Sequence, residues 1–406
     1  MEETKAAVFV APANENIFIR LVSTSSEVLQ LQDEDSLVFH PEYTHQLFGE
    51  NECIFGYKQP RVDLWYGAST LTTYFHFGYN EKGSEADLEG AQIDFVEDII
   101  GDKLAPGYLN NKEEFLARLE RETSFRPFGE LVHVYTSNED DRECPYEVYK
   151  GDILTPGLRD YHARLQTFIL WFIDAASFID VDDENWQFYF LFERKTVDGQ
   201  PMYCIVGYAT VYKYYAFPDK TRPRISQFLI LPTFQRRGHG AQLLQIIYNQ
   251  YVGDQRVLDI TVEDPSDEFT GLRDYVDAGN CSRLSSFQPS AMKSGFSQEM
   301  ALQAQKQLKI NKQQARKVYE ILRLRATDRS NPVEYKDYRL AVKRRLNKPF
   351  QKEQSDLKKL ERVLNPDELA ATIASTGLEE RHQKLNTLYE ITEQSYLRTV
   401  EKLASM

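Results

Sequence analysis

Arginine and glycine stand together in one short segment, Arg236-Arg237-Gly238-His239-Gly240, between an apolar run and an amphipathic stretch. The apolar run 225–231 is typical of a buried strand, and apolar side chains then recur at helical spacing as far as Tyr251. Glycines let a backbone approach a ligand closely, and the first N–H groups of a helix have no intrahelical partners. With two arginines beside them, these groups predict a site for a phosphate or pyrophosphate. The alternative is an ordinary strand-to-helix turn in which glycine only permits the backbone conformation.

Comparison with known phosphate motifs narrows the choice. A dinucleotide fingerprint requires glycine or alanine at position 243, which is Leu243, and the Gly-Lys-Ser/Thr of a Walker loop is absent. A longer pattern, Gln/Arg-x-x-Gly-x-Gly/Ala after an apolar strand, is met by the run from Gln235 to Ala241. The loop thus matches neither of these two motifs but keeps the glycines and arginines of a phosphate site.

Carboxylates form a second candidate site, in the stretch 257–265. Its alternation separates three apolar from three polar side chains, namely Leu258, Ile260 and Val262 from Asp259, Thr261 and Glu263. Pro265 ends the predicted strand and leaves Glu263 and Asp264 at its end, where open α/β sheets bind ligands. The alternative is a polar strand ending without a role in chemistry. A further acidic run, 180–184, is by itself typical of a solvated loop.

The composition of the whole chain limits what these sites can serve. The 406 residues are 42% apolar, 13% aromatic and 27% charged, which is typical of a soluble globular protein of two or three domains and excludes a mainly disordered or collagen-like chain. Residues 1–300 carry 26 basic and 48 acidic side chains, whereas residues 301–406 carry 22 and 14. The acidic first part would repel duplex DNA and favours a cationic ligand.

The sequence does not support a membrane-spanning protein, a secreted protein or a metalloprotein. No run approaches the roughly 18 apolar residues of a membrane span, and the acidic start is unlike a signal peptide. The four cysteines form no Cys-x-x-Cys pair and the seven histidines no His-Glu-x-x-His motif, so we expect reduced thiols and no metal site.

Strands and helices alternate around the two candidate sites. We expect strands at 188–192, 204–215, 225–231 and 257–262, and helices at 161–173 and 240–251. This pattern predicts an α/β (α+β) fold. We expect a mixed α/β domain over 1–130, a core domain over 131–280, a linker over 281–297 and a basic helical domain over 298–406.

The glycine loop resembles the coenzyme A loop of the GCN5-related N-acetyltransferase superfamily. The resemblance narrows to the catalytic subunits of type B histone acetyltransferases, because similar blocks occur along most of the chain. These blocks are 221–244, 257–265 and 272–276, with Ala176 to Trp186, Glu42 to Lys58 and Asn311 to Asp328. The resemblance implies acetyl-CoA as the acetyl donor and lysines in the N-terminal tail of newly made, free histone H4 as acceptors. It also implies a WD-repeat propeller histone chaperone as partner, no direct contact with nucleic acid or membrane, and a location in nucleus and cytoplasm.

The resemblance assigns coenzyme contacts to two groups of residues. Main-chain groups of Phe228, Leu229 and Ile230 are expected to bind the acetyl and pantetheine portion, while their side chains pack as an ordinary core strand does. The pyrophosphate is assigned to seven consecutive residues, Gln235, Arg236, Arg237, Gly238, His239, Gly240 and Ala241.

Acetyl transfer to lysine requires a neutral amine. Because the unperturbed pKa of lysine is near 10.4, only about one lysine in a few thousand is neutral at pH 7, so a carboxylate that takes the proton is expected. The resemblance assigns this role to Glu263 and places Glu184 and Asp264 near the acceptor lysine as further carboxylates.

Two blocks match stretches that contact the histone tail in the family. The first is Glu50, Asn51 and Glu52, where Asn51 replaces an acid found in some members. The second is Tyr212, Lys213 and Tyr214, whose tyrosines alternate along a strand and are equally compatible with a core position. Asp267 and Glu268 depart from the neutral or basic residues usual after the Pro265 turn, so no coenzyme contact is carried over there.

Two other functions remain open. One is a non-catalytic histone-binding module on a degenerate acetyltransferase fold, against which the intact glycine loop and Glu263 argue. The other is an N-acetyltransferase for small amines, for which the large acidic N-terminal region is more than is needed.

Overall fold

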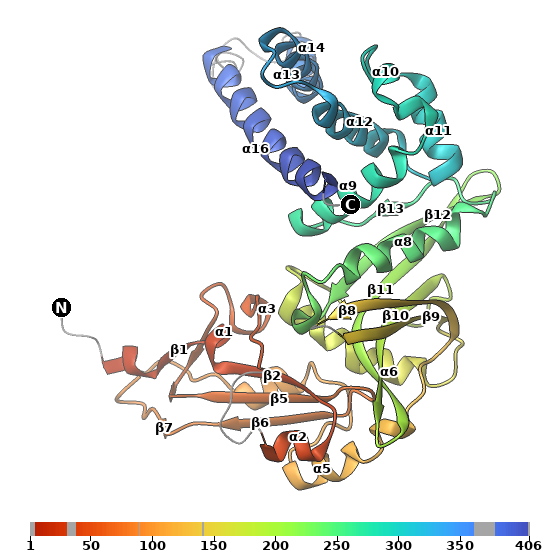
Figure 1. Ribbon diagram of the computed structural model, residues 1–406. Helices are drawn as coiled ribbons and strands as arrows, with labels where there is room; N and C mark the ends of the chain where they lie inside the picture. Colours follow the sequence, from red (N-terminus) through yellow and green to blue (C-terminus); the bar gives the residue numbers. More distant parts are fainter. Residues whose placement is uncertain (1–4, 31–37, 89, 140–141, 361–377, 405–406) are drawn as a thin grey trace. The chain divides into compact units, whose positions relative to one another are not determined.

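The computed structural model describes residues 5–30, 38–88, 90–139, 142–360 and 378–404 (Figure 1). Contacts divide the chain into two compact units. The first combines Met1–Tyr215 with Pro223–Ile247, and the second combines Ala216–Arg222 with Tyr248–Met406. Sheets and helices are both present, which confirms the predicted α/β class. The units do not follow the expected boundaries at 130 and 281.

The main sheet of the first unit contains five long strands in the order β12-β11-β10-β9-β8. Their bounds are β8 (Glu130–Glu139), β9 (Arg142–Asp152), β10 (Trp186–Val197), β11 (Gln200–Ala216) and β12 (Lys220–Ile230). The strands β8 to β11 are antiparallel to their neighbours. The strands expected at 188–192, 204–215 and 225–231 are thereby confirmed, except that Leu231 follows the end of β12.

A smaller three-stranded sheet precedes the main one and shares its core. It has the order β2-β5-β6, with β2 (Ile17–Val22) parallel to β5 (Arg61–Gly67) and β5 antiparallel to β6 (Thr73–Gly78). Buried side chains of this sheet, such as Leu64, belong to the same hydrophobic cluster as Phe188 of β10. This common core explains why residues on both sides of position 130 form one compact unit.

Short helices cover this core. The helix expected over 161–173 is three consecutive pieces, α6 (Leu158–Leu165), η4 (Gln166–Phe168) and α7 (Ile169–Phe172). The other short elements of the unit are η1 (Lys5–Phe9), β1 (Val10–Pro12), α1 (Ala13–Asn16), α2 (Ser25–Gln30), α3 (His45–Phe48), β3 (Cys53–Phe55), β4 (Tyr57–Lys58), β7 (Glu81–Lys82), α4 (Val96–Gly101), α5 (Lys112–Leu119) and η3 (Glu122–Ser124).

The chain leaves β12 through η5 (Pro232–Phe234) and enters α8 (His239–Val252). This confirms the strand–loop–helix order and the helix predicted over 240–251. Leu243, Leu244 and Ile247 are buried, because they repeat on one face of the helix.

The second unit is mainly helical and has its own core. Its long helices are α9 (Asp267–Cys281), α11 (Gln298–Leu308), α12 (Lys312–Ala326), α13 (Pro332–Leu346), α14 (Lys348–Leu360) and α16 (Leu378–Ala404), and its strand is β13 (Thr261–Val262). The segment 281–297, expected to be a linker, contains η6 (Ser285–Phe287) and α10 (Pro289–Met292) and buries Leu284, Phe287 and Met292 in this core. Apolar side chains therefore tie the segment to the helices.

Candidate active site

The strand before the glycine loop has two distinct faces. Leu229 is 5% exposed and packs in the hydrophobic core, whereas Phe228 and Ile230 are half-buried on the other face. The side-chain amide of Gln235 donates to the carbonyl of Ile230 at 2.9 Å. The first residue of the predicted pyrophosphate loop is thereby tied to the end of β12.

A glycine that the sequence analysis did not select lies opposite this end of β12. A Cβ atom added to Gly207 would lie 2.4 Å from the carbonyl oxygen of Leu229 and 3.0 Å from the Cα of Ile230. The pairing with β10 skips Val206 beside this glycine, which is the register of a β-bulge. Only glycine fits this approach of the two strands, and a glycine inside an apolar strand was the feature that could have indicated it.

The loop itself turns through two residues in left-handed conformations. Arg236 has a φ of 64° and Gly238 a φ of 90°, and a Cβ atom added to Gly238 would meet nothing within 4 Å. Glycine is thus favoured here by the backbone conformation and not by crowding. Arg236 and Arg237 are exposed, and the amide of Gln242 bonds the Gly238 carbonyl at 3.2 Å in the first turn of α8. The arrangement of exposed arginines at a helix start fits a pyrophosphate group.

His239 has a structural side chain. It is 1% exposed, its Nδ1 lies 2.9 Å from the hydroxyl of Tyr135, and its ring packs 4.4 Å from that of Tyr146. The side chain therefore joins the start of α8 to β8 and β9. The side chain of His239 is therefore not available to a ligand.

The carboxylates Glu263 and Asp264 follow β13 and belong to the second unit, whereas the glycine loop belongs to the first. Both residues are exposed, and Asp264 has a φ of 29°. The preceding residues are fixed within the second unit, since Asp259 accepts a bidentate bond from Arg222 at 2.5 and 3.2 Å. Of the strand expected at 257–262, only Thr261 and Val262 form β13, because Leu258 and Ile260 bond other segments.

Glu184 lies in an acidic loop that is attached to β11 by its neighbour. The hydroxyl of Tyr212 donates to Asp183 Oδ2 at 2.7 Å, and the main-chain and side-chain amides of Asn185 donate to Oδ1 at 2.9 and 2.8 Å. These hydrogen bonds lower the pKa of Asp183, and the Asp183 carboxylate raises the pKa of Tyr212. The structure thus brings together the acidic loop and the Tyr212 block, although Asp183 was not selected from the sequence.

Aromatic rings line the same part of β11. The ring of Tyr212 lies edge-on to Trp186 at 4.9 Å and 4.5 Å from the ring of Tyr214. The guanidinium of Arg224 lies 4.6 Å above Tyr214. Both tyrosines are at least partly exposed, so they form a surface rather than the core that their alternation also allowed.

The block Glu50 to Glu52 divides into exposed and engaged residues. Glu50 and Asn51 are exposed, but the carboxylate of Glu52 accepts the amides of Thr44 and His45 at 2.6 and 3.0 Å at the start of α3. The Thr44 bond is the main cause of the lowered pKa of Glu52. Glu52 thus stabilises its own loop.

This loop is anchored on the chain that leads to the acidic run. The amide of Gln46 donates to the carbonyl of Ala176 at 2.9 Å, and His45 Nε2 lies 3.3 Å from Asp174. Further along, Gln227 of β12 donates to the carbonyl of Ser177 at 3.1 Å. The segment 171–185 therefore contacts the loop that holds Glu52, through His45 and Gln46, and the strand that carries Tyr212.

The thiols and possible metal ligands add little to this site. Burial raises the pKa of Cys204 to about 12 and raises that of Cys281. Such protonated thiols are poor nucleophiles. Within the described part of the chain, no three histidine, cysteine or acidic side chains are grouped to hold a metal, and no helix is long and apolar enough to cross a membrane.

Comparison with known protein families first defines the class of protein to which the chain belongs. Residues 155–268, which contain the glycine loop, match the description "Acetyltransferase (GNAT) family", so the chain is an acetyltransferase of this fold. Residues 9–174 match "Histone acetyl transferase HAT1 N-terminus", and residues 273–324 match "Histone acetyltransferase type B catalytic subunit, C-terminal".

Full-length relatives define the family. The chain is 44% identical to the type B histone acetyltransferase catalytic subunit of Mus musculus, over 99% of this chain and 96% of that protein, and 43% identical to that of Homo sapiens, over 99% and 95%. A relative from Dictyostelium discoideum is 37% identical over 78% of this chain and 69% of its own length. The chain belongs to the family of type B histone acetyltransferase catalytic subunits.

Proposed function

We propose that this enzyme transfers the acetyl group of acetyl-CoA to lysine side chains in the N-terminal tail of free, newly synthesised histone H4. The observation that carries the proposal is the similarity to type B histone acetyltransferase catalytic subunits over 99% of the chain. The glycine loop between β12 and α8 and the acidic surface of the first unit support it.

Acetyl-CoA would supply a thioester whose carbonyl an amine can attack. The residues that would hold its pyrophosphate are Gln235 to Ala241, because the arginines here are exposed and the space beside Gly238 is open. His239 would contribute its main-chain N–H only, since its side chain is buried against Tyr135 and Tyr146. Main-chain groups of Phe228 to Ile230 would hold the acetyl and pantetheine portion.

Glu263 is the proposed general base. Its carboxylate would take a proton from the acceptor lysine, so that the neutral amine attacks the thioester directly in a ternary complex. A covalent acetyl-cysteine intermediate is disfavoured at Cys204 and Cys281, because burial keeps both thiols protonated. We assign Glu184 and Asp264 to the surroundings of the acceptor lysine.

The histone tail is cationic, and its proposed binding surface is acidic and aromatic. Glu50 and Asn51 lie on one loop, Glu184 on the next, and Tyr212 to Tyr214 on the strand to which that loop is bonded. Glu52 would act by shaping its loop. Exposed carboxylates beside aromatic rings attract lysine and arginine side chains.

The first experiment measures acetylation of an H4 tail peptide by purified protein with acetyl-CoA. Glu263→Gln is expected to lower kcat by roughly 10²-fold or more, the scale of general-base assistance. Glu268→Gln, which removes an exposed acid from the first turn of α9, is the control and should leave kcat unchanged. Equal activity of Glu263→Gln and wild type would remove Glu263 from the mechanism.

The same assay with a polyamine in place of the peptide separates the alternatives. Acetylation of the polyamine but not of the peptide would indicate a small-amine acetyltransferase. Peptide binding without acetylation by wild-type protein would indicate a binding module.

A partner and a location complete the proposal. By resemblance to the family, we propose a WD-repeat propeller histone chaperone as partner and a distribution over nucleus and cytoplasm. Co-migration with such a chaperone in size-exclusion chromatography and fractionation of the tagged chain would test the two statements. Separate elution, or a signal confined to one fraction, would contradict them.

A further inference from the structure

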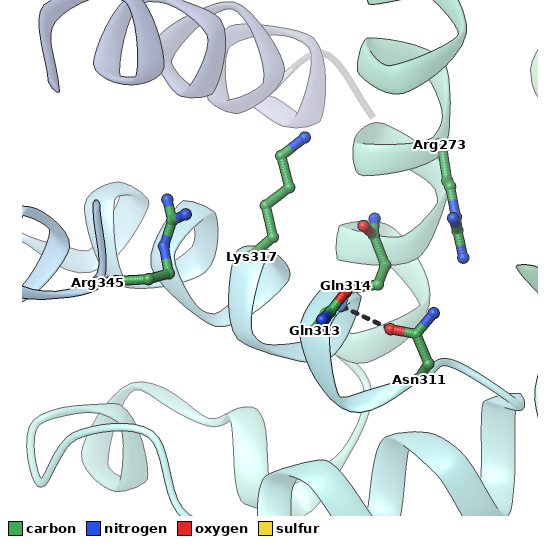
Figure 2. A pocket seen from close by; sticks show the side chains of 6 residues that line it. All are labelled: Arg273, Asn311, Gln313, Gln314, Lys317 and Arg345. Carbon is green, nitrogen blue, oxygen red and sulfur yellow. Dashed lines mark hydrogen bonds between the residues drawn. The ribbon is translucent and has the colours of Figure 1, made fainter. Parts of the chain in front are cut away.

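The helical unit contains a cavity of about 220 Å³ (Figure 2). It lies between α9, the first turns of α12 and the end of α13. The lining side chains are three cations and three amides, namely Arg273, Lys317 and Arg345 with Asn311, Gln313 and Gln314. No carboxylate is among these lining residues, although the unit has several buried acids nearby.

Each cation of the lining is held by an acid behind it. The pairs are Arg273 with Asp277 at 3.4 Å, Lys317 with Asp274 at 2.7 Å, and Arg345 with Glu320 at 2.9 Å. The side chains of these three acids are at most 2% exposed. The cations are therefore ordered before any ligand arrives, which reduces the entropy that binding must overcome.

The positions of the lining groups are fixed further by main-chain contacts. Arg273 Nη2 donates to the carbonyl of Ile260 at 3.1 Å, and Asn311 Oδ1 accepts the amide of Gln314 at 2.9 Å as the N-cap of α12. Because Oδ1 of Asn311 accepts this bond, the NH2 group of the same side chain is left as a donor at the cavity. The start of α12 adds the partial positive charge of a helix N-terminus.

Some side chains of the lining have hydrogen-bond donors that these contacts do not use. The Nε atom of Arg273 is buried and faces Asp277 Oδ2 at 3.4 Å, but the two atoms do not form a hydrogen bond. Lys317 has three donor hydrogens, of which its ion pair with Asp274 occupies one side. Gln313 is exposed, and no hydrogen bond or ion pair of its side chain is found within the described ranges. Lys317 and Gln313 therefore have donor hydrogens left for a ligand.

Charge favours an anion as the missing acceptor. Arg316, which is outside the lining, also pairs with Glu320 at 3.3 Å, so the ion pairs behind the cavity join four cations to three acids. Guanidinium, ammonium and amide donors arriving from three helices suit a ligand with several oxygens and more than one charge.

We propose that this cavity is a binding site for a phosphate-monoester dianion, carried either by a small compound or by a phosphorylated side chain. Arg273, Lys317 and Arg345 bind its oxygens as charged donors, and the amides of Asn311 and Gln313 complete the site. The site is independent of the proposed acetyl transfer, because all of its residues lie in the helical unit and it requires neither coenzyme nor histone.

The test is titration calorimetry of the full chain at constant ionic strength, with sodium chloride as the reference. One arm uses inorganic phosphate and the other a glycine-flanked phosphoserine peptide. Gln313→Glu places a negative charge at the cavity without removing any ion pair, and a carboxylate in the first turn of α12 does not disfavour the helix. Gln383→Glu, an exposed position of α16 outside the lining, makes the same charge change elsewhere.

We expect one phosphate per chain for wild type and for Gln383→Glu. Gln313→Glu should weaken binding by about tenfold or more, the effect of one like charge at this range, and Gln313→Lys should strengthen it. Binding of both probes would point to a phosphorylated protein, and binding of inorganic phosphate alone to a small compound. No heat with either probe, or equal affinity of the Gln313→Glu and Gln383→Glu variants, would overturn the proposal.

Discussion

Replacing Gly207 by alanine tests whether the close approach of β11 and β12 supports coenzyme binding. The added Cβ atom would lie 2.4 Å from the carbonyl oxygen of Leu229, about 0.6 Å inside the closest distance that Cβ atoms adopt. Because the obstacle is backbone, no side-chain rotation can relieve it. The two strands must separate at Leu229 and Ile230, which are the residues proposed to hold the acetyl and pantetheine portion.

The expected loss of stability combines two opposing terms. Overpacking costs about 1–3 kcal/mol, while a Gly→Ala change in a compatible strand gains about 0.4–1 kcal/mol through the unfolded chain. We therefore expect Gly207→Ala to lower the free energy of unfolding by about 1–2 kcal/mol. Gly78→Ala at the end of β6 is the matched control, because its Cβ would come no closer than 3.4 Å to another atom.

The assay combines urea unfolding with acetyl-CoA titration and single-turnover acetylation. A displacement approaching 1 Å at the reacting group can cost about 10²-fold in rate, so Gly207→Ala should lose both affinity and rate at temperatures where it is still folded. If Gly207→Ala matched Gly78→Ala in stability and bound acetyl-CoA as wild type does, the role given to this contact would be refuted.

Three further predictions concern the loop, the acidic surface and the core. Gly238→Ala and Gly199→Ala both place a side chain at positive φ in open space, so both should lose about 1–2 kcal/mol of stability, but calorimetry should show weaker acetyl-CoA binding only for Gly238→Ala. Tyr212→Phe removes the hydrogen bond to Asp183 and should raise the KM for an H4 tail peptide more than it lowers kcat in steady-state assays; the reverse pattern would contradict a role in tail binding. Burial lowers the pKa of His162 to about 3, so the neutral ring contributes stability above pH 6.5 that is lost progressively as the pH falls towards 3, by up to about 1.4 kcal/mol per pH unit. His162→Leu should flatten this acid dependence in urea melts at pH 4–7, and an unchanged slope would contradict the assignment.

Local patterns were sufficient to predict the loop and the elements on either side of it. The alternation of β12 and the spacing of apolar residues in α8 depend on neighbours a few positions away, so the sequence contains them directly. The helix expected over 161–173 is interrupted at Gln166–Phe168, where apolar residues continue but the helical hydrogen bonding changes. Propensity does not resolve such a change, because packing against the sheet decides it.

Long-range contacts account for what the sequence analysis missed. Gly207 is important because a strand more than 20 residues later passes over it, and Asp183 because the hydroxyl of Tyr212, 29 residues later, donates a hydrogen bond to it. The segment 281–297 has the composition of a linker, yet Leu284 and Phe287 reach the core of the helical unit. In each case the decisive contact is made by a residue that is distant in sequence. Hydrophobic periodicity along the chain does not reveal such contacts.

The same reasoning changes how the acidic surface is understood. Counting acids along the chain treats Glu50, Glu52, Asp183 and Glu184 as equivalent, but hydrogen bonds lower the pKa of Glu52 and Asp183 because their carboxylates already hold main-chain amides or Tyr212. Glu50 and Glu184 are exposed and have no ion pair among the described residues. A cationic tail would thus contact Glu50 and Glu184 directly, whereas Glu52 and Asp183 fix the loops that carry these two residues. Neutralising Glu184 should therefore weaken peptide binding in a salt-dependent way, while neutralising Glu52 should disturb the loop at any ionic strength.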